Sequence, residues 1–174
     1  MIEFVATNKN AFYAHFSEKL MEEAFPLCER PSFMDMERRD SSLFHACTIL
    51  KGEEAVGLFN FWSFSDFDYI EHFAISPQLR NNGIGQVALQ HFLQKSPRMT
   101  ILEAELPTNE LAERRLLFYQ RNGFFINPHP YIQPAYRPNG ETLAMNILST
   151  QELDDDSFEK VRHHLYRFVY KAEL

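Results

Sequence analysis

Apolar residues recur along the chain with two different periods, one typical of helices and one typical of strands. Between residues 10 and 25, apolar side chains return about once per helical turn, and Pro26 ends the run. Shorter apolar runs bounded by turn residues predict strands. The pattern predicts helices over 10–25, 31–39, 84–95, 110–122 and about 150–171, and strands over 1–7, 44–50, 55–64, 69–75, 99–106, 124–127 and 142–148.

The order of these elements combines hairpins with crossover connections. A tight turn at 51–54 joins two strands, whereas a helix separates strand 69–75 from strand 99–106. Hairpin strands are antiparallel and crossover strands are parallel. The sequence therefore predicts an α/β fold, with a central mixed β-sheet flanked by helices. The length of 174 residues favours a single domain over 1–174.

Two segments near the C-terminus carry more specific predictions. Ser149 and Glu152 have the spacing of a capping box, which would start the last helix. One stripe of that helix is apolar and is expected to pack on the sheet. The four prolines between 127 and 140 predict a long, stiff loop. The stripe consists of Phe158, Val161, Leu165 and Phe168.

Composition and charge narrow the class of protein. A formal net charge of −7 lacks the basic excess that a nucleic-acid surface requires, so no nucleic-acid partner is expected. No apolar run reaches the roughly 20 residues of a membrane span, and residues 1–9 lack a secretion-signal layout. We therefore expect a cytoplasmic protein with no membrane partner. Cys28 and Cys47 show no CxxC spacing and are expected to be free thiols, with no metal site.

A strand, a glycine-containing loop and a helix follow one another between residues 69 and 95. The first turn of a helix carries unpaired N–H groups and the positive end of the helix dipole. Gly83 and Gly85 would let the backbone approach a ligand closely, and Arg80 adds a guanidinium suited to phosphate. Together these features predict a pyrophosphate cradle. The glycines also suit an ordinary tight turn at a helix start, a reading that this segment leaves open.

A different phosphate motif overlaps the same residues. The run Gly83-Ile84-Gly85-Gln86-Val87-Ala88 fits the permissive G-x-G-x-x-A pattern of dinucleotide-binding folds, and Glu103 lies near the expected distance for a ribose ligand. That motif needs its first glycine tight against the end of a strand. Here seven residues separate Ile75 from Gly83, so this reading is disfavoured. A Walker loop is excluded because no Gly-Lys-Ser/Thr occurs.

Two stretches resemble the signatures of the GNAT superfamily of N-acetyltransferases. The run Arg80-Asn81-Asn82-Gly83-Ile84-Gly85 matches the R/Q-x-x-G-x-G/A signature, and the preceding run from Glu71 to Pro77 looks like the family's fourth strand. The run Phe118-Tyr119-Gln120-Arg121-Asn122-Gly123-Phe124 resembles the second signature, a helix Tyr followed by Gly-Phe. The resemblance is best over residues 44–124, and the element order extends it over nearly the whole chain.

The resemblance implies an enzyme that uses acetyl-CoA (coenzyme A) as co-substrate and binds it through the backbone. In such enzymes loop amides hold the pyrophosphate, which carries over to Arg80, Asn81, Asn82, Gly83, Ile84 and Gly85. The preceding strand pairs with the pantetheine arm, which carries over to Phe73, Ala74 and Ile75. Acceptor specificity in the family resides in segments that correspond here to residues 29–43 and 128–141.

Acetyl transfer to an amine needs a proton acceptor and a proton donor. Tyr119 is the candidate acid, because a phenol is protonated at neutral pH and can donate to a sulfur anion. Glu71 is the candidate base, on a strand that otherwise looks buried. Strand alternation would place Glu71 and His72 on opposite faces, and His72 or solvent remain alternative bases. Many members place an Asn where this chain has Ala112, and Asn109 should not inherit its role.

The sequence therefore predicts acetyl transfer from acetyl-CoA to a primary amine of a small molecule or peptide, by direct attack in a ternary complex. The alternative is a non-catalytic acyl-CoA-binding or sensing module that keeps the cradle. A homodimer is possible. The acceptor, the base, the oligomeric state and the use of other acyl groups stay open.

Overall fold

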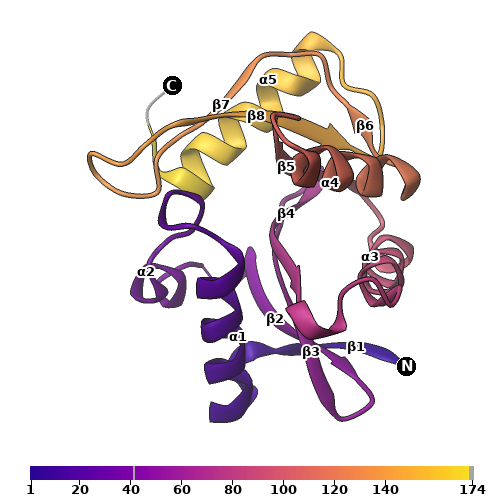
Figure 1. Ribbon diagram of the computed structural model, residues 1–174. Helices are drawn as coiled ribbons and strands as arrows, with labels where there is room; N and C mark the ends of the chain where they lie inside the picture. Colours follow the sequence, from indigo (N-terminus) through magenta and orange to yellow (C-terminus); the bar gives the residue numbers. More distant parts are fainter. Residues whose placement is uncertain (41, 173–174) are drawn as a thin grey trace. The chain divides into compact units, whose positions relative to one another are not determined.

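The computed structural model describes residues 1–40 and 42–172 and divides into two compact units, residues 1–100 and 101–174 (Figure 1). Ser41, which belongs to the predicted acceptor segment 29–43, lies outside the described residues. That residues 1–174 form one domain remains a prediction.

The first unit is built on four antiparallel strands that follow chain order from β1 to β4. The strands are β1 (Ile2–Ala6), β2 (Phe44–Lys51), β3 (Glu54–Ser63) and β4 (Phe67–Ile75). The helices are α1 (Ala11–Ala24), α2 (Phe33–Glu37) and α3 (Ile84–Lys95). Figure 1 shows α1 and α2 on one side of these strands and α3 on the other.

Packing on both faces of these strands fixes the first unit. On one face, Leu20 and Met21 of α1 join a buried cluster with Leu58 and Ala74 of the sheet. On the α3 face, the ring centroid of Phe92 lies 4.7 Å from that of Phe59. A sheet covered on both faces needs apolar residues at successive positions, which explains the nearly continuous apolar run of β3.

The second unit has its own antiparallel strands and two helices. Strand β8 (Leu143–Ser149) pairs with β5 (Met99–Glu105), with the short β6 (Phe125–Ile126) and with β7 (Tyr131–Gln133). The helices are α4 (Glu110–Arg121) and α5 (Asp155–His164), and a π-helical stretch, Leu165–Tyr170, follows α5.

The structure corrects the predicted start of the last helix. Helix α5 begins at Asp155, and its N-cap is Asp154, whose side chain accepts a hydrogen bond from the Ser157 amide at 2.8 Å. Ser149 is the last residue of β8, and its hydroxyl accepts from the side-chain amide of Asn127. A hydroxyl engaged in that way does not form the predicted capping box.

Two other predictions near the C-terminus also change. The predicted loop 127–140 contains β7, whose three residues pair with β8. Phe158, Val161 and Leu165 of the apolar stripe are buried as expected. The π-helical stretch then moves the stripe by one position, so that Val169 is buried in place of the predicted Phe168.

Candidate functional site

The loop between β4 and α3 presents an uncapped helix N-terminus. Gly83 is the N-cap residue of α3 with φ +75°, a left-handed conformation that favours glycine, and no side chain caps the helix. A Cβ atom placed on Gly83 would meet nothing within 4 Å, so the space beside it is open. Asn81 is also left-handed, with φ +64°. The first-turn amides of α3 are therefore presented toward an open space that suits an anion.

The predicted loop residues lie against the end of β4 within the same unit. The Nε atom of Arg80 donates a hydrogen bond to the carbonyl oxygen of Ile75 at 3.0 Å, which ties the loop to the strand. Opposite Ile75 in β3 lies Gly57, where a Cβ atom would come within 2.5 Å of the Ala74 carbonyl oxygen. Only glycine fits there without displacing the strand that is predicted to pair with pantetheine.

A β-bulge interrupts β4 at Glu71. Asn60 of β3 pairs with His72, and the next residue, Phe61, pairs with Ile70, so Glu71 is the extra residue. The side chains of Glu71 and His72 both contact residues of segment 25–39. The prediction that they lie on opposite faces is therefore wrong, because it assumed unbroken alternation along the strand.

Glu71 is enclosed by a buried ion pair and an indole. Arg39, which follows α2, donates from both terminal nitrogens to the two carboxylate oxygens, and Trp62 Nε1 donates to Oε2 at 2.8 Å. The side chains of Arg39 and Glu71 are 5% and 0% exposed. Burial would raise the pKa of Glu71, but the Arg39 charge, the neighbouring His72 and the hydrogen bonds from Arg39 and Trp62 together outweigh it, and the pKa falls to about 2. A carboxylate held in this way is a weak proton acceptor at neutral pH.

His72, the alternative base, is also enclosed. It is 1% exposed, its Nε2 atom lies 3.1 Å from the carbonyl oxygen of Glu29, and its ring packs edge-on against Phe25. Burial lowers the pKa of His72, although the neighbouring Glu71 partly opposes this. His72 is therefore neutral at pH 7, and its surroundings are those of a packed core residue.

Tyr119 lies in the second unit, at the end of α4, where the second signature forms a Schellman motif. The amide of Phe124 donates to the Tyr119 carbonyl at 3.1 Å, and the amide of Gly123 donates to the Gln120 carbonyl. Gly123 has φ +91°, which this motif requires. The ring centroids of Tyr119 and Phe124 lie 5.7 Å apart. The spacing of Tyr, Gly and Phe in the signature thus has a structural cause.

The hydroxyl of Tyr119 hydrogen-bonds no other group within the described parts of the chain. Burial raises the pKa of Tyr119 to about 12, despite the opposing charge of Arg115, so the phenol stays protonated at neutral pH. On the same helix Asn109 is the N-cap, with its side chain accepting from the Ala112 amide at 3.0 Å. Asn109 therefore has the role of a helix cap, and Ala112 is buried.

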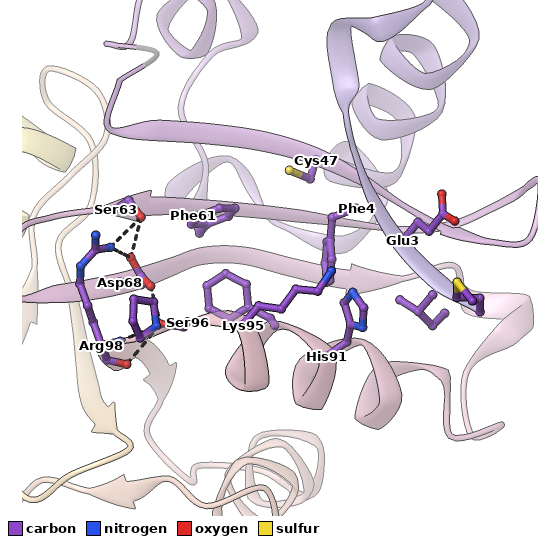
Figure 2. Close-up of a pocket in the computed structure, with 14 residues that line it drawn as sticks. Glu3, Phe4, Cys47, Phe61, Ser63, Asp68, His91, Lys95, Ser96 and Arg98 are labelled. Carbon is purple, nitrogen blue, oxygen red and sulfur yellow. Dashed lines mark hydrogen bonds and ion pairs between the residues drawn. The ribbon is translucent and has the colours of Figure 1, made fainter.

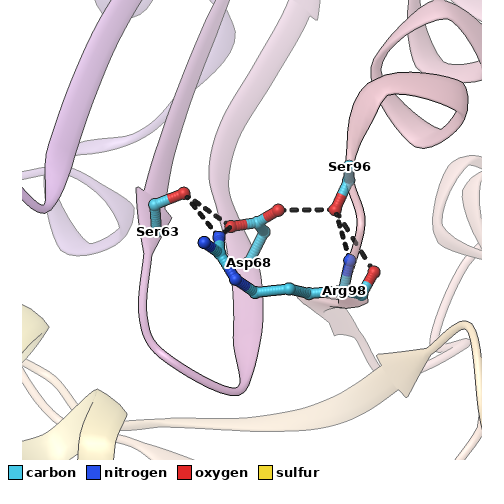
Figure 3. Close-up of polar contacts among 4 residues, drawn as sticks. All are labelled: Ser63, Asp68, Ser96 and Arg98. Carbon is cyan, nitrogen blue, oxygen red and sulfur yellow. Dashed lines mark hydrogen bonds and ion pairs between the residues drawn. The ribbon is translucent and has the colours of Figure 1, made fainter.

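A separate hollow of about 670 Å³ lies between β1 and the C-terminal half of α3 (Figure 2). It contains none of the predicted site residues. One end is closed by Asp68, which accepts hydrogen bonds from Ser63, Ser96 and Arg98 (Figure 3). Cys47 lines the hollow as a free thiol, and burial raises its pKa to about 11. The polar groups at the closed end thus satisfy one another.

The structure adds two negative observations over residues 1–40 and 42–172. No helix in these ranges has the length and apolar character to cross a bilayer. In the same ranges, no group of three or more His, Cys, Asp and Glu side chains is placed to hold a metal ion.

Comparison with known proteins decides the family. Residues 8–124 match the sequence profile of the acetyltransferase (GNAT) family. The chain belongs to the GNAT family of acetyltransferases. The GNAT enzymes take the acetyl group from acetyl-CoA and transfer it to amines. No protein with a curated description matches the sequence.

Solved structures support the GNAT fold over the whole chain. A protein of Bacteroides thetaiotaomicron assigned to the GNAT family is 32% identical, covers 99% of both chains and gives a TM-score of 0.91. A GNAT acetyltransferase of Elizabethkingia anophelis with acetyl-CoA bound is 17% identical over 87% of this chain and 97% of its own, with a TM-score of 0.59.

A third structure, Arabidopsis thaliana Naa50 with the bisubstrate analogue CoA-Ac-MVNAL, is 17% identical over 86% of this chain and 98% of its own, with a TM-score of 0.63. The last two likenesses show the fold alone. The predicted α/β fold class and GNAT membership are confirmed.

The structure also reveals two residues near Glu71 that the sequence reasoning missed. Arg39 and Trp62 lie 32 and 9 positions from Glu71, and neither belongs to a family signature. A buried-looking acidic residue on a strand signals that some cation must pair with it, but the sequence does not say which one.

Proposed function

We propose that this GNAT enzyme transfers an acetyl group from acetyl-CoA to a primary amine of a small molecule or peptide, by direct attack in a ternary complex. The observation that carries the proposal is the uncapped N-terminus of α3, opened by the left-handed Gly83 next to an open space. A non-catalytic acyl-CoA-binding module is disfavoured, because the chain belongs to an enzyme family. A cytoplasmic location and a homodimer remain predictions.

The residues at this helix start fit a pyrophosphate. The backbone amides of the segment Arg80–Gly85 would hold its oxygens, helped by the helix dipole. The backbone of Phe73, Ala74 and Ile75 would pair with the pantetheine arm as an added strand. When bound, acetyl-CoA supplies an activated acyl thioester with a thiolate leaving group. The Arg80–Ile75 hydrogen bond supports this arrangement, because it keeps the loop close to the end of β4.

The amine must be neutral to attack, whereas a Lys-like alkylammonium has a pKa of about 10.4 in water. Glu71 is the base predicted from the sequence, with His72 and solvent as alternatives. The ion pair of Glu71 with Arg39 and the burial of His72 weigh against both side chains. We therefore favour loss of the ammonium proton to solvent before attack. The assignment of Glu71 as the base stays a prediction.

Tyr119 would donate its phenolic hydrogen to the departing sulfur. Its protonated state at neutral pH supports this role, as does a hydroxyl without a hydrogen-bond partner among residues 1–40 and 42–172. A pKa near 12 makes complete proton transfer to a thiolate unfavourable. The main contribution of Tyr119 would then be a hydrogen bond that stabilises the thiolate as it forms.

Acetyl-CoA binding is tested by thermal unfolding. Acetyl-CoA should raise the melting temperature of the natural protein, and Gly83→Glu should abolish the shift by placing a carboxylate in the cradle. Gly52→Glu is the matched control, because Gly52 also has positive φ and open space within 4 Å of where a Cβ atom would lie, but belongs to the β2–β3 hairpin. Absence of a shift in the natural protein would overturn the proposal.

Turnover is tested with a panel of amines and detection of the released thiol. Tyr119→Phe should lower kcat by about tenfold or more, because it removes one donor to the leaving sulfur. Tyr166→Phe is the control, since the hydroxyl of Tyr166 donates instead to the Ile132 carbonyl at 2.6 Å. Equal turnover in Tyr119→Phe and the natural protein would remove Tyr119 from the mechanism.

A further inference from the structure

The guanidinium of Arg39 is held in one place from three directions. Its Cζ atom lies 4.5 Å from the ring centroid of Phe44 and 4.9 Å from that of Trp62. Phe44 and Trp62 face each other across β2 and β3. The third contact is the two-pronged pair with Glu71. Aromatic rings that pack on a guanidinium, together with a carboxylate that accepts hydrogen bonds from both of its terminal nitrogens, fix the orientation of the guanidinium as well as its position.

The carboxylate of Glu71 is committed to this arrangement. One oxygen accepts from Arg39, and the other accepts from both Arg39 and Trp62. The side chain has no exposed surface. To take a proton from a bound amine, Glu71 would first have to break its ion pair with Arg39. That would leave an unpaired charge in the protein interior. The contacts therefore suit a residue that holds another residue in place.

The pair joins two segments at a defined point of the strand. Arg39 lies one residue beyond Arg38, the C-cap of the five-residue helix α2, and the Arg39 amide donates to the Met36 carbonyl at 3.2 Å. Glu71 is the bulged residue of β4, two positions before Phe73. Such a short helix is not stable by itself, so its position depends on contacts of this kind.

The direction of the bound cofactor places the reaction near this point. In the proposed function, the pyrophosphate lies at 80–85 and the pantetheine arm runs back along Ile75, Ala74 and Phe73. The thioester end of an extended arm then points toward Glu71. The acceptor amine must approach that end, so the segment that Arg39 anchors borders its path.

We propose that Arg39 and Glu71 form a positioning pair that seats α2 beside the acceptor amine, and that Glu71 does not act as the base. This inference rests on the proposed function for the direction of the cofactor. Glu71 holds Arg39, and Arg39 holds the end of α2. Loss of either residue should therefore weaken acceptor binding in the same way.

The kinetic test compares Glu71→Gln, Arg39→Gln and the double variant, using the best amine of the panel. Each single variant should raise the KM of the amine about tenfold, with little change in kcat and in the KM of acetyl-CoA. The double variant should resemble the single variants, because the two residues act as one unit. Arg98→Gln is the matched control, since it removes a cation from the other β4 carboxylate, Asp68. The KM of the amine should not change in this variant.

A base would behave differently in the same experiment. Glu71→Gln would then lower kcat by about a hundredfold or more and remove the acidic limb of the pH profile, whereas Arg39→Gln would keep most of kcat. That result would overturn the proposal, as would natural KM values in both variants. If Arg39→Gln does not fold, Trp62→Phe removes one donor to Glu71 while keeping a ring under Arg39, and a smaller rise in amine KM is expected.

A second measurement is independent of turnover. Hydrogen exchange over residues 33–40 should become faster in Glu71→Gln and Arg39→Gln, but not in Arg98→Gln. Acetyl-CoA should still raise the melting temperature of all three variants. Unchanged exchange over 33–40 would overturn the proposal even if no amine is turned over. Loss of the acetyl-CoA shift in the natural protein would instead count against the proposed function.

Discussion

Strand β4 carries two ion pairs that differ in how deeply the arginine is enclosed. The carboxylates of Glu71 and Asp68 are both buried, with exposed fractions of 0% and 4%. Arg39, the partner of Glu71, is 5% exposed, whereas Arg98, the partner of Asp68, is 36% exposed. The depth of the arginine, rather than that of the acid, separates the two pairs.

This difference decides what remains when the arginine is lost. Asp68 keeps hydrogen bonds from the hydroxyls of Ser63 and Ser96, and water can reach the position of Arg98. Glu71 keeps the indole of Trp62, while the space left by Arg39 is walled by aromatic rings. Both pairs link β4 to a distant segment, but the link at Asp68 is shared among several polar groups, whereas the link at Glu71 depends mainly on one buried arginine.

The largest expected effect is on stability. Arg39→Gln should lower the free energy of unfolding by about 3–5 kcal/mol, because it leaves a buried carboxylate without its cation. Arg98→Gln should cost about 0–1 kcal/mol, as expected for a pair with an exposed member. Urea unfolding at pH 7 measures both values. Similar losses of unfolding free energy in the two variants would contradict the difference drawn between the two ion pairs.

Acid should remove the contribution of the Glu71 pair. The folded-state pKa of Glu71 is about 2, below the ordinary value of 4.5, so its ionised form stabilises the fold. The contribution, on the order of 3 kcal/mol, is complete above about pH 4.5 and is lost as the pH falls toward 2, with about 2 kcal/mol gone by pH 3. The difference in unfolding free energy between the natural protein and Glu71→Gln should shrink accordingly. A constant difference between pH 7 and pH 3 would contradict this assignment.

Removal of one neutral hydrogen-bond donor from each carboxylate should give a smaller difference in stability between the two sites. Trp62→Phe takes an N–H from Glu71, and Ser63→Ala takes a hydroxyl from Asp68. The first should cost about 1–3 kcal/mol, because hydrogen bonds to a buried charged group are strong. The second should cost less, because Asp68 also has Ser96 and Arg98. Thermal unfolding can rank the two variants, and the reverse order would count against the comparison.

The smallest expected effect is that of salt on the stability costs of the two arginine substitutions. At 1 M salt the Debye length is about 3 Å, so interactions of exposed charges are largely screened. The cost of Arg98→Gln should then approach zero, while the cost of Arg39→Gln should hardly change. Urea unfolding at about 0.1 M and 1 M NaCl is the measurement. A strong salt dependence of the Arg39→Gln cost would mean that water reaches this pair.

Local patterns made much of the fold predictable. Helix α3 starts and ends at the predicted residues, Ile84 and Lys95. The left-handed turn at Gly83 also agrees with the predicted loop. Such features depend on residues close together in the sequence, which is why periodicity and turn chemistry reveal them.

Features that depend on distant residues could not be predicted in the same way. The pairing of Arg39 with Glu71 spans 32 positions and exists only in the folded chain. Ser149 has the right spacing for a helix cap, but Asn127, 22 positions away, engages its hydroxyl. Strand β7 is hidden among prolines, and its pairing with β8 defines it. The chemical roles of Tyr119 and the loop residues stay proposals.

The bulge at Glu71 has a consequence for how this sequence can vary. Because β4 accommodates one surplus residue there, deletion of that single position would restore regular pairing and leave the residues on both sides facing as they do now, whereas a deletion outside the bulge would turn each residue on one side of it to the opposite face. Substitutions along β4 alter one side chain at a time, whereas a one-codon deletion outside the bulge would alter many at once. Among single-residue deletions along this strand, those at the bulge should therefore preserve strand pairing best, and those elsewhere should rarely fold.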